Sequence, residues 1–249
     1  MRLLEIFFAL LGREVKRYFN DRKRLFAALI LPIIWLIIFG PGFGLSFRYG
    51  FSDISYEQYI LPGIVGMTIL FGSLWSGTSM LRDEQTGFAK ILKTSPISDV
   101  TIAASKSLAT TFVNVLQVII LLILYSIFVS RIEAISISFV LIITLILSFA
   151  FSSLGILIGS LIDTMESYDT VINILILPFL FLSGSLFPIE RAVIWMHYIS
   201  NLNPLTYGID IMRGIVLGVS NFNYIFDIEI VIFSAVFLFI CSILAISRK

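Results

Sequence analysis

The chain has 249 residues, of which 58% are hydrophobic and 13% charged, and its formal net charge is +1. With a mean hydropathy of +1.02, a soluble domain of this size could not bury so much apolar surface. The near-neutral charge gives no basis for nucleic-acid binding. The single cysteine, Cys241, excludes a disulfide within the chain. The composition therefore predicts an all-α membrane protein, folded as one domain over residues 1–249.

Seven runs free of Asp, Glu, Lys and Arg approach the roughly 20 apolar residues that a helix needs to cross a bilayer. They are residues 25–47, 58–81, 107–130, 134–162, 170–189, 192–209 and 230–247. The run 192–209 is the most polar, since it contains Asn201, Asn203 and Pro204. We predict that this run does not cross the membrane.

Basic residues gather in alternate connections: before residue 25, between residues 82 and 93, and at the C-terminus. The positive-inside rule then places both termini and the segment 82–98 in the cytoplasm. Both termini on one side require an even number of crossings. We therefore predict six spans, at residues 25–47, 58–81, 101–130, 134–162, 168–187 and 226–247. A seventh span would put the C-terminus outside.

Residues 1–24 precede the first predicted span. Apolar residues recur there at helical spacing, and acidic and basic residues lie between them: Leu4, Phe8, Leu11, Val15 and Tyr18, interleaved with Glu5, Arg13, Lys16 and Arg17. This pattern predicts an amphipathic helix in the membrane interface. A signal peptide is disfavoured because Glu5 interrupts its apolar core and no small-residue cleavage site follows. Anchoring the chain and contacting a partner both fit such a helix.

The connection 82–98 is a polar island between two long apolar runs. Within it Phe88, Ile91 and Leu92 are spaced i, i+3 and i+4, which predicts a short amphipathic helix. A linker between two spans needs only polar residues and a turn. The apolar face indicates instead a docking element for a cytoplasmic protein.

Small residues recur at four-residue spacing in the second and fourth predicted spans. They are Gly72, Ser73, Ser76 and Gly77 in one, and Ser148, Ser152, Gly155 and Gly159 in the other. Such stripes let membrane helices approach closely. Packing within one subunit is favoured over packing between two.

Residues 188–218 predict a helical hairpin that dips into the outer leaflet and returns. Asn203 suits an N-cap, Pro204 suits the first helical position, and Gly218 can end the helix. Two short helices should therefore follow the fifth span. Trp195 and Tyr198, with Tyr207, fit the aromatic belt at the interface.

Asp210 and Arg213 are spaced i, i+3 on the second of these helices and should form an ion pair. An ionisable pair near the membrane suggests a functional role. A structural pin that holds the hairpin is the favoured interpretation. The lone His197 nearby is more typical of a solvated side chain than of a proton site.

No motif for catalysis or nucleotide binding is present. The sequence has no Gly-x-x-x-x-Gly-Lys-[Ser/Thr] phosphate loop and no Cys/His cluster for a metal. Asp163, Glu166 and Asp169 could bind a cation, but a hydrated turn between two spans is favoured. The span interiors have few ionisable residues, which disfavours an ion-coupled carrier. Uphill transport would therefore need a second polypeptide as its motor.

The chain resembles the ABC-2 family, the membrane-spanning subunits of one class of ATP-binding-cassette exporters. The likeness rests on the basic amphipathic start, on Arg82-Asp83-Glu84-Gln85-Thr86-Gly87 followed by Thr94-Ser95-Pro96-Ile97-Ser98, and on Ser183-Gly184, Phe187-Pro188, Asn203-Pro204-Leu205-Thr206-Tyr207 and Arg213. The last group is similar to the drug-resistance and nodulation-factor export branch. A proline usual in that branch shortly after Phe187-Pro188 is missing from residues 191–195.

The resemblance implies a homodimer in the cytoplasmic (inner) membrane, paired with two ATPase subunits that hold ATP and Mg²⁺. No cofactor is expected on this chain. The implied coupling contacts are Glu84, Gln85, Thr86, Gly87, Phe88, Ile91 and Leu92 in a coupling helix between spans two and three, with help from the N-terminal helix. The implied external hairpin and gate contain Phe187, Pro188, Asn203, Pro204, Tyr207, Asp210 and Arg213.

The implied activity is ATP-driven export of a hydrophobic or amphiphilic substrate by alternating access. Such a substrate would be a drug, a lipid or a lipid-linked glycan. A self-contained channel or ion-coupled carrier, or a membrane scaffold without transport, are the alternatives.

Overall fold

The computed structural model describes residues 2–21, 26, 30–38, 55–129, 131–189 and 192–248. These residues form helices and connecting turns without any strand, which confirms the all-α prediction. The helices are α1 (Arg2–Asn20), α3 (Tyr56–Leu74), the 3₁₀ turn η1 (Trp75–Gly77), α4 (Thr78–Gln85), α5 (Phe88–Thr94), α6 (Asp99–Phe128), α7 (Ala134–Leu161), α8 (Met165–Phe181), α9 (Ile194–Ser200), α10 (Pro204–Leu217) and α11 (Tyr224–Arg248).

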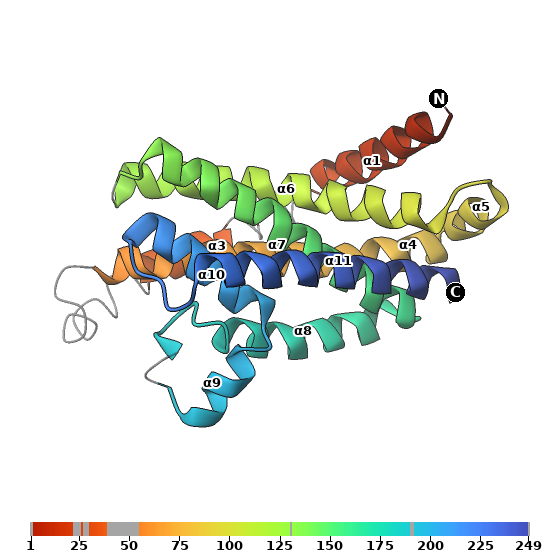
Figure 1. Cartoon of the computed structure of the whole chain (residues 1–249). Coiled ribbons are helices and arrows are strands. Elements are labelled where there is room, and N and C mark those ends of the chain that lie inside the picture. Colours follow the sequence, from red (N-terminus) through yellow and green to blue (C-terminus); the bar gives the residue numbers. More distant parts are fainter. Residues whose placement is uncertain are drawn as a thin grey trace.

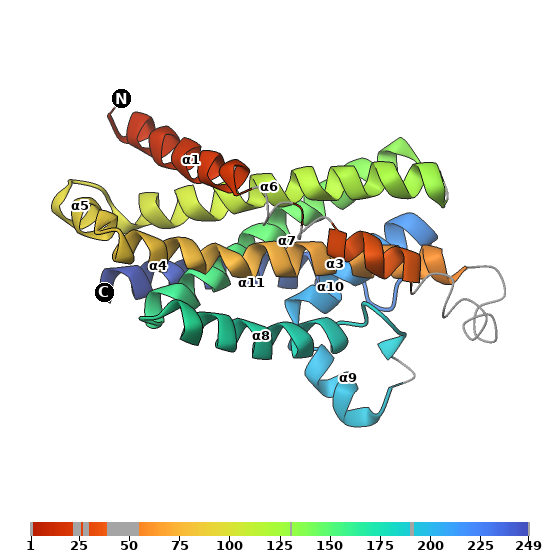
Figure 2. The ribbon, with the colours of Figure 1, turned by 180° about the vertical axis from the view of Figure 1, so that it is seen from behind.

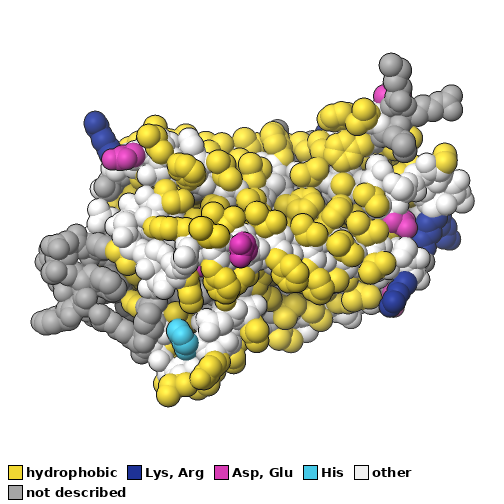
Figure 3. Space-filling model, viewed as in Figure 1, with side chains coloured by type: hydrophobic (Ala, Val, Ile, Leu, Met, Phe, Trp, Pro, Cys, Tyr) yellow, Lys and Arg dark blue, Asp and Glu magenta, His cyan; other side chains and the backbone are white. Residues whose placement is uncertain are grey.

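The long helices lie side by side in an elongated bundle (Figure 1). Helix α7 is central and packs against α3, α6, α10 and α11. Helix α1 runs along α6, and α8 lies on the opposite side of the bundle (Figure 2). Both chain ends lie towards the end that carries α5, and α9 lies towards the other end. Hydrophobic side chains cover much of the face between these ends (Figure 3).

Four helical stretches of the described residues are long and apolar enough to cross a membrane: Tyr56–Gln85, Asp99–Phe128, Ala134–Leu161 and Tyr224–Arg248. The chain is thus a multi-pass membrane protein. Helix α8 has 17 residues. Of the predicted first span, only residues 26 and 30–38 are described, and they are helical. The glycine-rich end of that span lies outside the described residues, so the count of six remains a prediction.

The run 192–209 is not one helix, because the chain leaves α9 after Ser200 and starts α10 at Pro204. Two short helices therefore follow α8, as predicted. The expected cap is present, since Asn203 Oδ1 accepts a hydrogen bond from the Leu205 amide at 3.0 Å. Gly218 ends α10 with a left-handed φ of 71°.

The predicted small-residue stripes pack against each other within the chain. Ser73 Oγ donates to the Ser148 carbonyl at 3.2 Å, and Ser76 Oγ donates to the Ser152 carbonyl at 2.9 Å. A Cβ on Gly77 would lie 2.1 Å from the Gly155 carbonyl oxygen. Only glycine lets the two backbones come this close, so these stripes join α3 and η1 to α7.

The polar island is more helical than predicted. The helix that begins at Tyr56 continues through η1 and α4 to Gln85, four residues beyond the predicted end of the span. Gly87 then takes a left-handed φ of 74°, which ends α4 and permits the turn into α5. The predicted short helix is α5, and Ser98 caps the following α6.

Candidate functional site: a buried charge cluster beside helix α5

Asp83 on α4 is the centre of a charge cluster that joins three helices. Its side chain is almost fully buried, with the residue 2% exposed. Arg13 Nη2 and Arg17 Nη1 on α1 donate to Asp83 Oδ1 at 2.7 and 3.1 Å. A buried carboxylate needs such donors, because an unpaired charge in a low-dielectric interior is costly.

Lys106 on α6 approaches Asp83 from the other side. Its ammonium donates to Asp83 Oδ2 at 2.6 Å, to Glu14 Oε1 at 3.2 Å and to Ser79 Oγ at 3.1 Å. Those three acceptors match the three protons of the ammonium group. The buried charges of Asp83, Glu14 and Lys106 therefore hold α1, α4 and α6 in one arrangement.

Arg13 extends the cluster to α5. Its guanidinium lies over the Phe88 ring, 3.7 Å from the ring centre, a cation–π contact. Burial alone lowers the pKa of Arg13, but the hydrogen bond to Asp83 and the charges of Asp83 and Glu14 outweigh it and raise the pKa. The guanidinium therefore stays charged while it contacts α1, α4 and α5 together.

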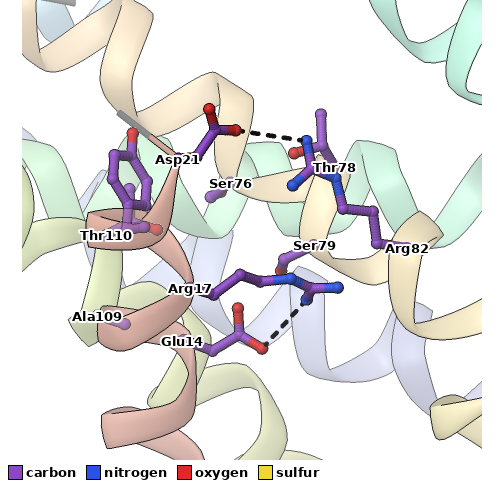
Figure 4. A pocket seen from close by; sticks show the side chains of 10 residues that line it. Glu14, Arg17, Asp21, Ser76, Thr78, Ser79, Arg82, Ala109 and Thr110 are labelled. Carbon is purple, nitrogen blue, oxygen red and sulfur yellow. Dashed lines mark ion pairs between the residues drawn. The ribbon is translucent and has the colours of Figure 1, made fainter. Parts of the chain in front are cut away.

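A second, smaller group of polar contacts lines a narrow pocket beside the cluster (Figure 4). Arg17 lies 3.7 Å from Glu14, and Arg82 lies 3.9 Å from Asp21. The first pair lies within α1, and the second joins α4 to Asp21, the residue that follows α1. The Arg82–Asp21 pair is more exposed than the contacts of Asp83, so solvent screens it more.

The two sides of α5 differ in their surroundings. Leu92 is buried in a small apolar cluster with Ile102 of α6 and Ile246 of α11, and Phe88 packs at its edge. Ile91 is 59% exposed, on the outer side. The predicted apolar face is therefore divided: Leu92 contacts the bundle and Ile91 points outwards.

A cavity of about 400 Å³ lies between α4, α5, the start of α6 and the end of α11. The predicted coupling residue Glu84 lines it, together with Asp83, Lys93, Lys106 and Arg248. The other predicted residues, Gln85 and Thr86, are exposed at the turn before α5. The seven predicted coupling residues thus lie together around α5. Their role in coupling stays a prediction.

The predicted hairpin residues lie at the other end of the bundle. Phe187 and Pro188 are half-buried, and Asn203 Nδ2 donates to the Phe179 carbonyl at 2.8 Å. Tyr207 is 3% exposed, and its hydroxyl donates to the Asn201 carbonyl at 2.7 Å. The assignment of Tyr207 to an interfacial belt is therefore wrong, because its ring packs against Phe222 and Phe226.

The predicted ion pair between Asp210 and Arg213 is also wrong, since no ion pair joins these two described residues. Arg213 Nη2 donates to the Gly184 carbonyl at 2.8 Å, and its guanidinium lies 4.0 Å from the centre of the Tyr59 ring. Asp210 accepts from residues 220–222 instead. The spacing i, i+3 permits a pair, but other partners compete for both groups.

Comparison with known proteins supports one family. The profile described as ABC-2 type transporter matches residues 5–217. The chain belongs to the ABC-2 type transporter family. This match spans the charge cluster, α5 and helices α9 and α10, so the site lies within the part of the chain that defines the family.

Three relatives illustrate the range of the family. A putative transport permease ycf38 of Cyanophora paradoxa is 32% identical, covering 80% of this chain and 71% of its own length. Nodulation protein J of Rhizobium meliloti (strain 1021) is 27% identical, covering 75% of this chain and 71% of its own. A probable multidrug ABC transporter permease YbhR of Escherichia coli (strain K12) is 23% identical, covering 70% and 48%. This ABC-2 chain is accordingly a transport permease.

Asp83, Glu14 and Lys106 were missed as site residues. Asp83 stands within the predicted polar island, and Lys106 interrupts the start of an otherwise apolar helix. A lone lysine at that position signals a buried partner, but its partners are 23 and 92 residues away along the chain. Only the packing of α1 along α6 brings them together.

Proposed function

We propose that this permease is the membrane-spanning subunit of an ATP-driven exporter, in which two copies pair with two ATPase subunits. The observation that carries the proposal is the divided face of α5, with Leu92 buried and Ile91 exposed beside the clamped charge cluster. ABC-2 permeases normally pair with an ABC ATPase. ATP and Mg²⁺ would bind to that partner, because this sequence has no phosphate loop.

Helix α5 is built to pass a displacement to the bundle. Arg13 ties it to α1 and α4, and Leu92 ties it to α6 and α11. Helix α4 continues through η1 into α3, which the small residues join to α7. A push on α5 would therefore move several membrane helices together rather than bend a loop.

The proposed cycle is alternating access. ATP would close the ATPase dimer, the α5 helices would move, and residues 188–218 would gate the outer exit. We place both termini and α5 in the cytoplasm and the protein in the inner membrane, on the strength of the basic residues near that end. A hydrophobic or amphiphilic substrate is supported by two relatives that are named as a nodulation protein and a multidrug permease.

The test uses the permease co-purified with its ATPase and reconstituted in liposomes. Ile91→Asp should abolish substrate-stimulated ATP hydrolysis and transport while the chain still folds, because a charge would replace an exposed apolar contact. Ile135→Asp is the matched control, since Ile135 is 70% exposed at the start of α7 at the other end of the bundle. Full transport and coupling by Ile91→Asp would contradict the proposal.

Glu84→Ala and Gly87→Trp extend the same test. Both should separate ATP hydrolysis from transport, since Glu84 faces the cavity behind α5 and Gly87 sets the turn before it. Transport by the permease alone in liposomes would indicate an ion-coupled carrier or a channel. An ATPase that binds but never responds to substrate would indicate a scaffold.

A further inference from the structure

Asp210 organises the connection between α10 and α11, far from the charge cluster. Its carboxylate accepts hydrogen bonds from Ser220 Oγ at 2.9 Å and from the amides of Asn221 and Phe222 at 3.0 and 3.1 Å. The residue is 2% exposed. Charge-assisted bonds of this kind fix the course of the loop 218–223.

Asp227, in the first turn of α11, is the second carboxyl group at this place. The residue is 0% exposed, and neither carboxyl oxygen has a hydrogen-bond partner among the described residues. An acidic side chain in a first turn commonly accepts from free backbone amides, and Asp227 does not. The rings of Tyr224 and Phe226, on the same turn of α11, contact Gly214 and Tyr207 on either side of Asp210 along α10, so Asp227 and Asp210 lie at the same helix contact.

No described cation compensates this pair. Arg213 is on the same helix as Asp210 but bonds to the Gly184 carbonyl and the Tyr59 ring. Tyr207 donates its proton to the Asn201 carbonyl. Helix α7, which packs along α11, has no ionisable residue between Ala134 and Leu161.

Helix α6 also packs against α11. Its charged residues are Asp99 and Lys106, which line the cavity beside α5 at the other end of the bundle. On α11 itself, Glu229 is exposed. Two negative charges at Asp210 and Asp227 would therefore lie together in a buried site where no described residue supplies an opposite charge, which is strongly unfavourable.

We propose that Asp210 and Asp227 form a proton-binding site in which one proton is shared between the two carboxyl groups. The proton sits on Asp227, which has no other donor, and the Asp227 hydroxyl donates to the Asp210 carboxylate. Asp210 keeps its charge because three donors from the loop already stabilise it. The shared proton then joins the start of α11 to α10.

A metal ion is the competing ligand, and the donor set disfavours it. Ca²⁺ and Mg²⁺ take about six or more oxygen ligands. Among the described residues, no three His, Cys, Asp or Glu side chains converge on one point. The carboxylate of Asp210 already accepts from three loop donors, which leaves few lone pairs for a metal ion but enough for one hydrogen bond from Asp227.

The consequence is a pH-dependent contact between α10 and α11, here called the latch, at the end of the bundle away from α5. The ring of Tyr224 packs directly on Gly214, so α10 and α11 already touch beside the carboxyl pair. Loss of the proton would place two like charges in this contact and push the helices apart. An aspartate in the unfolded chain loses its proton at about pH 4. Because the folded pair keeps one proton at higher pH, the stability of this end should fall as the pH rises.

Infrared difference spectroscopy of the purified chain in lipid nanodiscs tests the site directly. The wild type should show the C=O stretch of a protonated carboxyl at neutral pH, and this band should disappear in alkaline buffer. Asp227→Asn should lack the band, and Glu229→Gln, an exposed neighbour on the same helix, should keep it. Absence of the band from the wild type, or its persistence in Asp227→Asn, would overturn the proposal.

Hydrogen exchange of residues 218–226 provides a second readout that needs no ATPase or substrate, so its outcome is independent of the proposed transport function. Wild type and Asp227→Asn are compared at the same pH, which cancels base catalysis of exchange. Their rates should agree in mildly acidic buffer, and the wild type should exchange about tenfold faster in alkaline buffer if like-charge repulsion costs about 1.4 kcal/mol.

If Asp227→Asn does not fold, the wild-type band and its loss in alkaline buffer still decide the question. Equal rates at every pH would contradict the latch. Protection of residues 218–226 that depends on added Na⁺ or Ca²⁺, together with absence of the band, would show that a cation occupies the site instead.

Discussion

The two ends of the bundle bury acidic side chains in opposite ways. Beside α5, Asp83 and Glu14 meet Arg13, Arg17 and Lys106, so every acid has a cationic donor within 3.2 Å. At the other end Asp210 meets backbone amides and Asp227, while Arg213 bonds elsewhere. The first arrangement locks helices together at any moderate pH. The second depends on a proton, so the same residue type has a different role at each end.

The largest effect is expected from removing the central charge of the cluster beside α5. Asp83→Asn should lower the free energy of unfolding by about 3 to 5 kcal/mol, because Lys106 stays buried without its closest carboxylate. Thermal unfolding in detergent measures this. Gln85→Ala, two residues on and exposed, should change stability by less than about 0.5 kcal/mol. A stable Asp83→Asn would show that the cluster does not hold the helices.

Asp210→Ala should have the next largest effect. It leaves the amides of Asn221 and Phe222 without their acceptor, at a cost of about 2 to 3 kcal/mol. The loss should be local, so hydrogen exchange should accelerate at residues 219–223 and not in α5. Unchanged protection of that loop would mean that other groups hold it.

Gly87 and Gly218 allow the two ends of the bundle to be compared at turns that do not involve a charged side chain. Both have left-handed φ values, 74° and 71°, and both have open space where a Cβ would lie. Gly87→Ala and Gly218→Ala should therefore each cost about 1 to 2 kcal/mol. A large difference between the two, measured by thermal unfolding, would show that one turn is held by more than backbone geometry.

The smallest effect is expected from Asp227→Asn, the same change of residue type as Asp83→Asn. An amide has nearly the shape of the protonated carboxyl and also donates to Asp210. Stability at neutral pH should therefore change by less than about 0.5 kcal/mol. A loss as large as that of Asp83→Asn would mean that both acids are charged and the two ends are alike.

Local features could be predicted from the sequence because their causes are local. The apolar runs, the Asn203 and Pro204 helix start, the glycine ends and the amphipathic spacing around Phe88 all depend on neighbours within a few residues. The small-residue stripes also indicated their own contact, since only close helix packing explains them. Contacts between charges that are far apart in the sequence could not be predicted in this way. Each charged residue has several possible partners of opposite charge, and the sequence does not say which of them lies nearby.

The predictions that proved wrong concern partner choice. The spacing of Asp210 and Arg213 permits an ion pair, yet loop amides and a buried carbonyl are the partners. Tyr207 has the amphipathic character of an interfacial residue, but it is enclosed by Phe222 and Phe226 from the next segment. In both cases groups outside α10 supply the contacts that are observed.

The sequence by itself determined that this chain is an all-helical membrane protein of the ABC-2 type, with a short amphipathic helix within residues 82–98. Hydropathy, short spacings and missing motifs are properties of the chain before it folds. The tertiary structure decided which side of that helix is exposed, that Arg13, Asp83 and Lys106 form one cluster, and that Asp210 and Asp227 lie at one contact between α10 and α11. These are decided by which helices pack together, and packing depends on all helices at once.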